Sequence, residues 1–108
     1  MKRDKRQRLE RAGWTVGGTA DFLGLKAQET RFIELKLALA TGVKRLRERQ
    51  GLTQASLAHQ LGSSQSRIAK MEAGDPSVSL DLMIRSLLGI GAEPAYIARL
   101  IRGARRAA

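Results

Sequence analysis

Residues 51–74, GLTQASLAHQLGSSQSRIAKMEAG, predict two short helices joined by a tight turn. Thr53 can cap the first helix, because its hydroxyl can accept a hydrogen bond from a free backbone N–H of the first turn. Gly62 ends that helix, since glycine tolerates the left-handed backbone found just past helix ends. Ser63 or Ser64 can cap the second helix. This order of helix, turn and helix is typical of the helix-turn-helix motif.

The composition limits the size and the partners of the protein. Its 108 residues suffice for one domain with a modest core. With 20 Lys and Arg against 10 Asp and Glu, the net charge of +10 favours nucleic acid as partner, with an anionic membrane as the alternative. The absence of cysteine excludes disulfides and Cys-bearing zinc sites. No apolar run approaches the roughly 20 residues of a membrane span, so we expect no membrane insertion and a cytoplasmic location.

Several positions of the motif match a known family in both residue type and spacing. They are Gly51-Leu52-Thr53-Gln54, Leu57-Ala58, Leu61-Gly62, Ser64-Gln65, Ile68-Ala69 and Met71-Glu72-x-Gly74. Over residues 38–91 the chain resembles the DNA-binding domain of the Cro and phage-repressor family, also called the xenobiotic-response-element family. The resemblance implies an all-α, lambda-repressor-like domain of about five helices, located in a bacterial cytoplasm and on the nucleoid when bound.

One position departs from the family pattern. The family usually has an apolar turn residue where this chain has Ser63. Either the turn is looser here, or the serine hydroxyl is used as a cap.

We expect three parts along the chain. Residues 1–34 form a basic N-terminal extension that packs on the core, residues 35–103 form the helix-turn-helix domain, and residues 104–108 form a basic tail. The basic start of the extension is either a phosphate-contacting arm or a solvated terminus.

The N-terminal extension changes character before the domain. Residues 12–18 predict a short extended segment, in which Trp14 either covers the core or belongs to a strand that pairs across a dimer. Thr19 can cap a short helix over residues 20–23, which Gly24 ends.

A long helix is predicted from Ala27 to Gln50, with a bend or interruption at Thr41-Gly42. Its apolar residues form two adjacent stripes: Phe32, Leu35, Leu39, Val43 and Leu46 in one, and Ile33, Leu37 and Ala40 in the other. An apolar arc this wide needs two neighbours, and we expect these to be the helix-turn-helix and the segment around Trp14 and Phe22.

Two further helices follow the motif. Ser79 can cap a broadly apolar helix that precedes Gly89 and Gly91, and Pro94 fits the first turn of a last helix that extends to about Arg102. In repressors of this type the last helix often dimerises. The apolar residues that we assign to dimerisation are Tyr96, Ile97, Leu100 and Ile101.

The family resemblance also implies an ion pair. Arg47 and Glu72 occupy the positions at which family members pair an arginine with a glutamate near the end of the recognition helix. The alternative is two solvated surface charges, which contribute little.

The same resemblance implies a DNA-reading surface. Gln54 would lie near a phosphate and hydrogen-bond Gln65, the first base-reading side chain. Arg67 and Lys70 would bind phosphates at the edge of that surface. The full set of DNA-binding candidates is Gln54, Ser63, Ser64, Gln65, Ser66, Arg67 and Lys70.

The sequence therefore predicts a sequence-specific repressor that binds a palindromic operator in double-stranded DNA as a homodimer. The chain also resembles HigA-like antitoxins, which implies a toxin partner and repression of the protein's own operon. This resemblance is carried by Gly13-Trp14, Val16-Gly17, Phe22-Leu23-Gly24-Leu25 and Glu34. The alternatives are a stand-alone or phage-type repressor, and a protein-interaction module or RNA binder. No catalytic constellation, metal site or cofactor site emerges, so we do not expect an enzyme.

Overall fold

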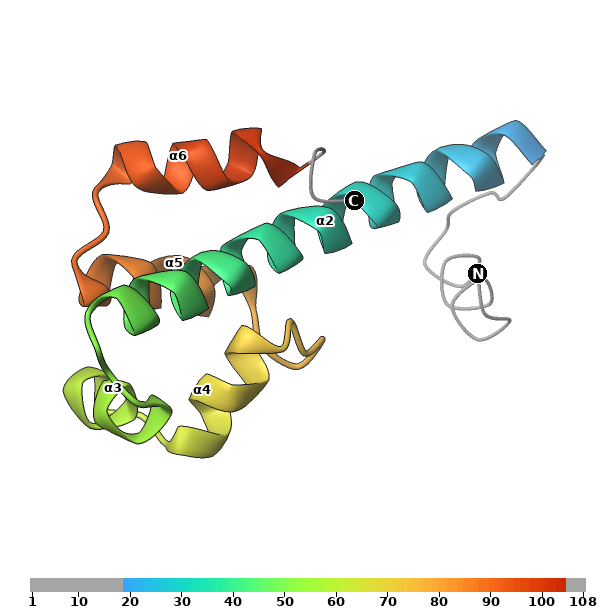
Figure 1. Ribbon diagram of the computed structural model, residues 1–108. Coiled ribbons are helices and arrows are strands. Elements are labelled where there is room, and N and C mark those ends of the chain that lie inside the picture. Colours follow the sequence, from blue (N-terminus) through green and yellow to red (C-terminus); the bar gives the residue numbers. More distant parts are fainter. Residues whose placement is uncertain (1–18, 105–108) are drawn as a thin grey trace. The chain divides into compact units, whose positions relative to one another are not determined.

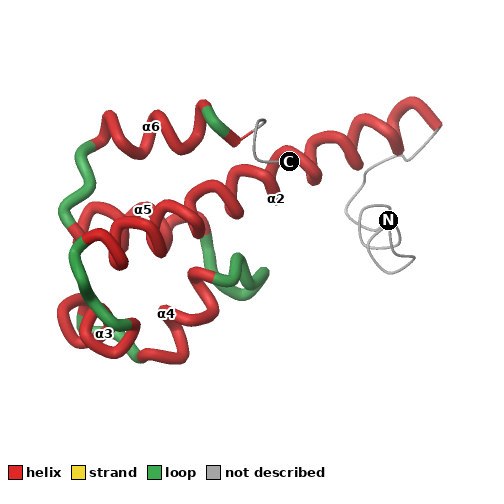
Figure 2. The backbone as a smooth tube through the Cα atoms, in the orientation of Figure 1, coloured by secondary structure: helices red, strands yellow, loops and turns green. Residues whose placement is uncertain are grey.

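The computed structural model describes residues 19–104, and this part of the chain is all-α (Figure 1). The helices are α2 (Thr19–Arg49), α3 (Gln54–Leu61), α4 (Gln65–Glu72), α5 (Leu80–Ile90) and α6 (Pro94–Arg102). Figure 2 shows only helices and connecting loops among the described residues. The predicted extended segment at residues 12–18, with Trp14, and the end of the basic tail lie outside the described residues.

The chain divides into two compact units, residues 1–32 and residues 33–108. The second unit contains the hydrophobic core, to which every helix contributes. The fully buried large side chains come from four helices: Leu39, Val43, Leu57, Ile68, Met71, Met83 and Leu87. Burying a side chain of this size stabilises the fold by roughly 1.5–3 kcal/mol relative to leaving it exposed. The core therefore fixes α3 through Leu57 and α4 through Ile68 and Met71.

Helix α2 is continuous, so the predicted stop at Gly24 and the predicted bend at Thr41-Gly42 are wrong. The side chain of Leu100 on α6 lies where a Cβ on Gly42 would have to stand. Gly42 thus serves the close approach of two helices, and the helix tolerates it. A Cβ built on Gly24 would meet no atom within 4 Å outside its own stretch of helix, and one exposed glycine costs a helix only about 1 kcal/mol.

Within the described residues, the second apolar stripe of α2 is covered only at Ala40, which is buried in the core. Ile33 is 55% exposed and Leu37 is 47% exposed, whereas Leu39 and Val43 are fully buried. Phe32, at the end of the first unit, is 49% exposed. The sequence predicts that the segment around Trp14 and Phe22 covers α2. The side chains of these residues lie outside the described part of the structure.

Local caps set the limits of α3 and α4. Thr53 Oγ1 accepts a hydrogen bond from the Ser56 N–H at 3.0 Å. Gly62 follows α3 with a φ of 65°, in the left-handed region. Ser64 caps α4, because its Oγ accepts a hydrogen bond from the Arg67 N–H at 3.2 Å. Of the two candidate caps, Ser64 is therefore the one that is used.

Ser63 does not cap α4, although its hydroxyl is buried in the turn. Its Oγ is buried and has no hydrogen-bond partner among the residues that the structure describes. Its backbone N–H donates to the Ala58 carbonyl at 2.8 Å, so the turn itself is closed. A buried hydroxyl without a partner costs free energy, because it gives up its hydrogen bonds to water.

Arg47 and Glu72 form the ion pair that the sequence predicts. Arg47 Nε donates to Glu72 Oε2 at 2.6 Å and Nη2 donates to Oε1 at 3.0 Å. Arg47 Nη1 donates to the Leu52 carbonyl at 2.8 Å. The side chains are only 12% and 4% exposed. The hydrogen bonds to Glu72, with its negative charge, raise the pKa of Arg47 above its ordinary value despite partial burial.

We expect Ser63→Ala to stabilise the protein by about 1 kcal/mol, because it removes a buried hydroxyl that lacks a partner. Chemical denaturation monitored by circular dichroism measures the change. Ser66→Ala, at an exposed position of α4, is the matched control and should have little effect. A loss of stability in Ser63→Ala would show that the hydroxyl is satisfied in solution.

We expect Arg47→Met to destabilise the protein by about 3 kcal/mol, because Glu72 then keeps a buried charge without its ionic partner. The double variant Arg47→Met/Glu72→Leu should recover much of this loss. Arg85→Met is the control, since the Arg85–Asp81 pair at 2.9 Å is 76% and 77% exposed and should contribute little. Equal urea midpoints for Arg47→Met and Arg85→Met would contradict a structural role.

Candidate nucleic-acid interface

Helix α4 presents one polar face to solvent and one apolar face to the core. The inward side chains are Ile68 and Met71, which are 0% and 1% exposed. The exposed residues on and next to the helix are Ser64, Gln65, Ser66, Arg67 and Lys70. Because the inward side chains are fully buried, the helix cannot rotate about its axis, and its outer face keeps a fixed orientation.

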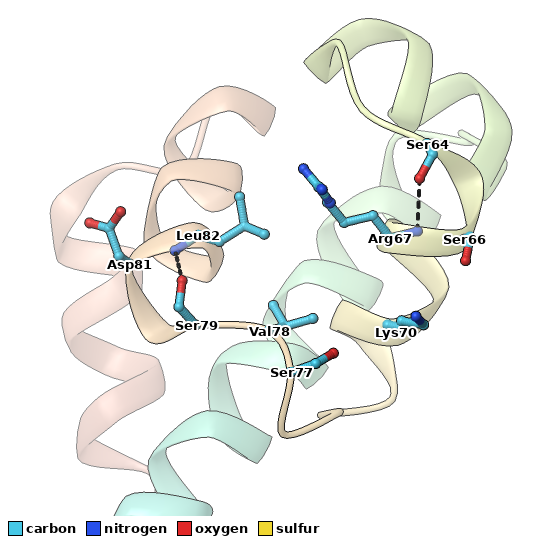
Figure 3. A pocket seen from close by; sticks show the side chains of 9 residues that line it. All are labelled: Ser64, Ser66, Arg67, Lys70, Ser77, Val78, Ser79, Asp81 and Leu82. Atoms are coloured by element: carbon cyan, nitrogen blue, oxygen red, sulfur yellow. Dashed lines mark hydrogen bonds between the residues drawn. The ribbon is translucent and has the colours of Figure 1, made fainter.

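A groove runs along this face, between α4 and the segment that leads into α5 (Figure 3). Its volume is about 580 Å³. Its lining is mainly hydroxyl-bearing and cationic: Ser64, Ser66, Arg67, Lys70, Ser77, Val78, Ser79, Asp81 and Leu82. In Figure 3 the Arg67 side chain extends from α4 toward the side where Leu82 lies. The groove thus offers hydrogen-bond donors and two positive charges to an anionic ligand.

The wall opposite α4 is a turn fixed by Asp75. Its Oδ1 accepts the Ser77 N–H at 2.8 Å, and its carbonyl accepts the Val78 N–H at 3.0 Å. Hydrogen bonding from Ser77 lowers the pKa of the Asp75 carboxyl, and the charges of Lys70 and Lys36 act in the same direction. The carboxylate therefore stays ionised and committed to the turn.

The sequence did not predict that the segment after α4 lines the groove. Ser77 and Ser79 line the groove, yet the sequence analysis gave Ser79 only a capping role, which its 3.1 Å contact with the Leu82 N–H confirms. The Asp-Pro-Ser sequence directly after the second helix of the motif favours a turn, and this turn could have indicated the wall.

The predicted DNA-binding residues do not all lie at the groove. Ser64, Ser66, Arg67 and Lys70 line it, and Gln65 is exposed on α4. The hydroxyl of Ser63 is buried, so it is not available to a ligand, which corrects the inclusion of this residue.

Gln54 also differs from its expected contact. Its Nε2 donates to Glu72 Oε1 at 3.2 Å, in place of the predicted hydrogen bond with Gln65. The reason is that Glu72, already paired with Arg47, is a strong buried acceptor next to the start of α3.

The four residues assigned to dimerisation have different environments. Ile97 is only 8% exposed, and Leu100 packs over Gly42, so both serve the core of their own chain. Tyr96 is half-buried, and the Arg99 guanidinium lies 5.5 Å from its ring centroid. Ile101 is 44% exposed and is the most exposed of the four.

Residues 19–104 offer neither a metal site nor a membrane-spanning helix. Among these residues, no three His, Asp or Glu side chains are grouped so that they could hold a metal ion. None of the described helices combines the length and apolar character needed to cross a membrane.

Comparison with known proteins agrees with the geometry. Residues 43–85 match the model of a family described as helix-turn-helix, and the match includes α3, α4 and the first turns of α5. No similar curated protein and no similar solved structure was found. This family is a DNA-binding regulatory family and not a family of enzymes. Residues 43–85 are therefore similar to a helix-turn-helix domain, which supports a DNA-binding role in transcription regulation.

Proposed function

We propose that the protein is a sequence-specific repressor that inserts α4 into the major groove of an operator. The observation that carries this proposal is the exposed polar face of α4, held outward by the buried side chains of Ile68 and Met71. The major groove admits an α-helix and displays a distinct pattern of donors and acceptors for each base pair.

The residues on this face divide into two roles. Gln65 reads bases, because a glutamine amide can bond N6 and N7 of adenine together. Arg67 and Lys70 bind phosphates beside the bases, and Ser64 and Ser66 supply hydroxyls for either purpose. Gln54 supports this surface through its hydrogen bond to Glu72, close to the free N–H groups that begin α3 and favour a phosphate.

The operator is a palindrome bound by a homodimer, with half-sites about 34 Å apart. This follows from the family resemblance and from the size of the domain, since one short helix contacts only a few base pairs. Ile101 is the exposed large apolar residue of α6 that contributes to the contact between protomers.

A narrower version of the proposal makes the protein the antitoxin of a type II toxin–antitoxin pair that represses its own operon in the cytoplasm. The exposed apolar side chains of Ile33 and Leu37 on α2 support a protein partner at this helix. Without such a partner the protein is a stand-alone or phage-type repressor.

We expect Gln65→Ala to weaken binding to the selected operator by about 5- to 100-fold and to leave binding to random duplex nearly unchanged. Arg67→Ala should weaken both and lower the salt dependence by about one phosphate contact. Fluorescence anisotropy at two salt concentrations, on an operator selected from a random library, measures both effects. Equal losses on both duplexes for Gln65→Ala would favour a nonspecific or RNA-binding module.

We expect the product of a neighbouring reading frame to co-purify with this protein if the antitoxin version holds. Ile33→Asp should then weaken the complex at least about tenfold, because it places a charge on the apolar contact. Thr41→Asp, at an exposed polar position of the same helix, is the control and should leave the complex intact. Absence of a complex on co-expression would leave the stand-alone repressor.

A further inference from the structure

Lys36 is a cation in an unusual place. It lies on α2, is only 8% exposed, and its Nζ donates to the Pro76 carbonyl at 3.4 Å. Lysine is rarely buried, because its ammonium group is strongly hydrated and needs hydrogen bonds to replace that water. The contact therefore joins α2 to the turn that follows α4.

The next residue of α2 holds the same turn. Leu37 Cδ2 would lie 2.7 Å from a Cβ built on Gly74, so the Leu37 side chain lies against this glycine. The φ of Gly74 is 70°, which independently favours glycine. Lys36 and Leu37 thus hold the segment between the end of α4 and the wall of the groove.

The segment that Lys36 and Leu37 contact leads directly into residues that line the groove. Pro76 is followed by Ser77, Val78 and Ser79, all of which line the groove opposite α4. Val78 is 4% exposed, which anchors the far end of the turn in the core. The separation of this wall from Arg67 and Lys70 depends on where Pro76 is held.

Resting on the proposed binding of duplex DNA, we propose that Lys36 is a positioning residue that sets the groove wall at Ser77–Ser79 against a DNA phosphate strand. Lys36 does not itself reach the DNA, because its ammonium group is directed to Pro76 and its side chain is buried. Serine hydroxyls and backbone N–H groups contact phosphates without reading sequence. Loss of Lys36 should therefore weaken binding to every duplex alike.

The experiment compares Lys36→Met with Lys44→Met in the full-length protein. Both variants lose one charge on α2, but Lys44 is exposed. Anisotropy with labelled duplexes of about 24 base pairs, one random and one carrying the selected operator, gives the affinities at matched folded fraction. Lys36→Met should weaken both duplexes about 3- to 10-fold, and Lys44→Met less than about 2-fold. Lys36→Arg should restore binding, and the Ser77 amide should exchange hydrogen faster in Lys36→Met alone.

The experiment distinguishes failure of the positioning role from failure of DNA binding. Equal losses in Lys36→Met and Lys44→Met, or a loss confined to the operator, would overturn the positioning role and leave DNA binding in place. Failure of the wild-type protein to bind either duplex would overturn the proposed function itself. If Lys36→Met does not fold, Lys36→Gln replaces it under the same criteria, since its amide keeps a donor but is too short to reach Pro76.

Discussion

The Glu72 carboxylate, bound by Arg47, is the contact on which the placement of α4 depends. An eight-residue helix is too short to be stable alone in water, so tertiary contacts must supply its stability. Glu72 accepts hydrogen bonds from α2 through Arg47 and from α3 through Gln54, while Arg47 also binds the Leu52 carbonyl. One buried anion thus joins three helices and the connection between them. Because a buried charge is costly without its partners, the arrangement favours a single geometry over nearby alternatives.

The positive charge of the protein is concentrated in its terminal segments and not in the groove along α4. More than half of the net charge of +10 comes from residues 1–18 and 105–108, and the groove itself contains Arg67 and Lys70 beside Asp81. Long-range attraction to DNA depends on the net charge, whereas discrimination between sequences depends on hydrogen bonds at the reading face. In the proposed complex the two properties are therefore carried by different residues, and the face of α4 can remain mostly uncharged.

The limits of the short helices were predictable because their signals are local. Thr53, Gly62 and Ser79 act within one turn of the helix that they begin or end. The continuity of α2 was not predictable, because the role of Gly42 is set by Leu100, a residue far away in the chain. The burial of Ile97, the packing of Leu100 against Gly42 and the bond of Gln54 to Glu72 were missed for the same reason. Each depends on which helices pack together, and the groove wall at Ser77 likewise exists only once α2, α4 and α5 are in place.

The two faces of α4 differ in what a substitution would change: the stability of the fold on one side, and the proposed DNA specificity on the other. Ile68 and Met71 contribute to the core, and Glu72 is held by the ion pair, so substitution at these positions affects folding. Gln65 and Ser66 are exposed and have few contacts to lose, so substitution there affects the surface and leaves the core unchanged. Specificity can therefore vary at constant stability. Gln54 is the exception, because its amide contacts Glu72, and a change there alters both the reading surface and the scaffold that holds it.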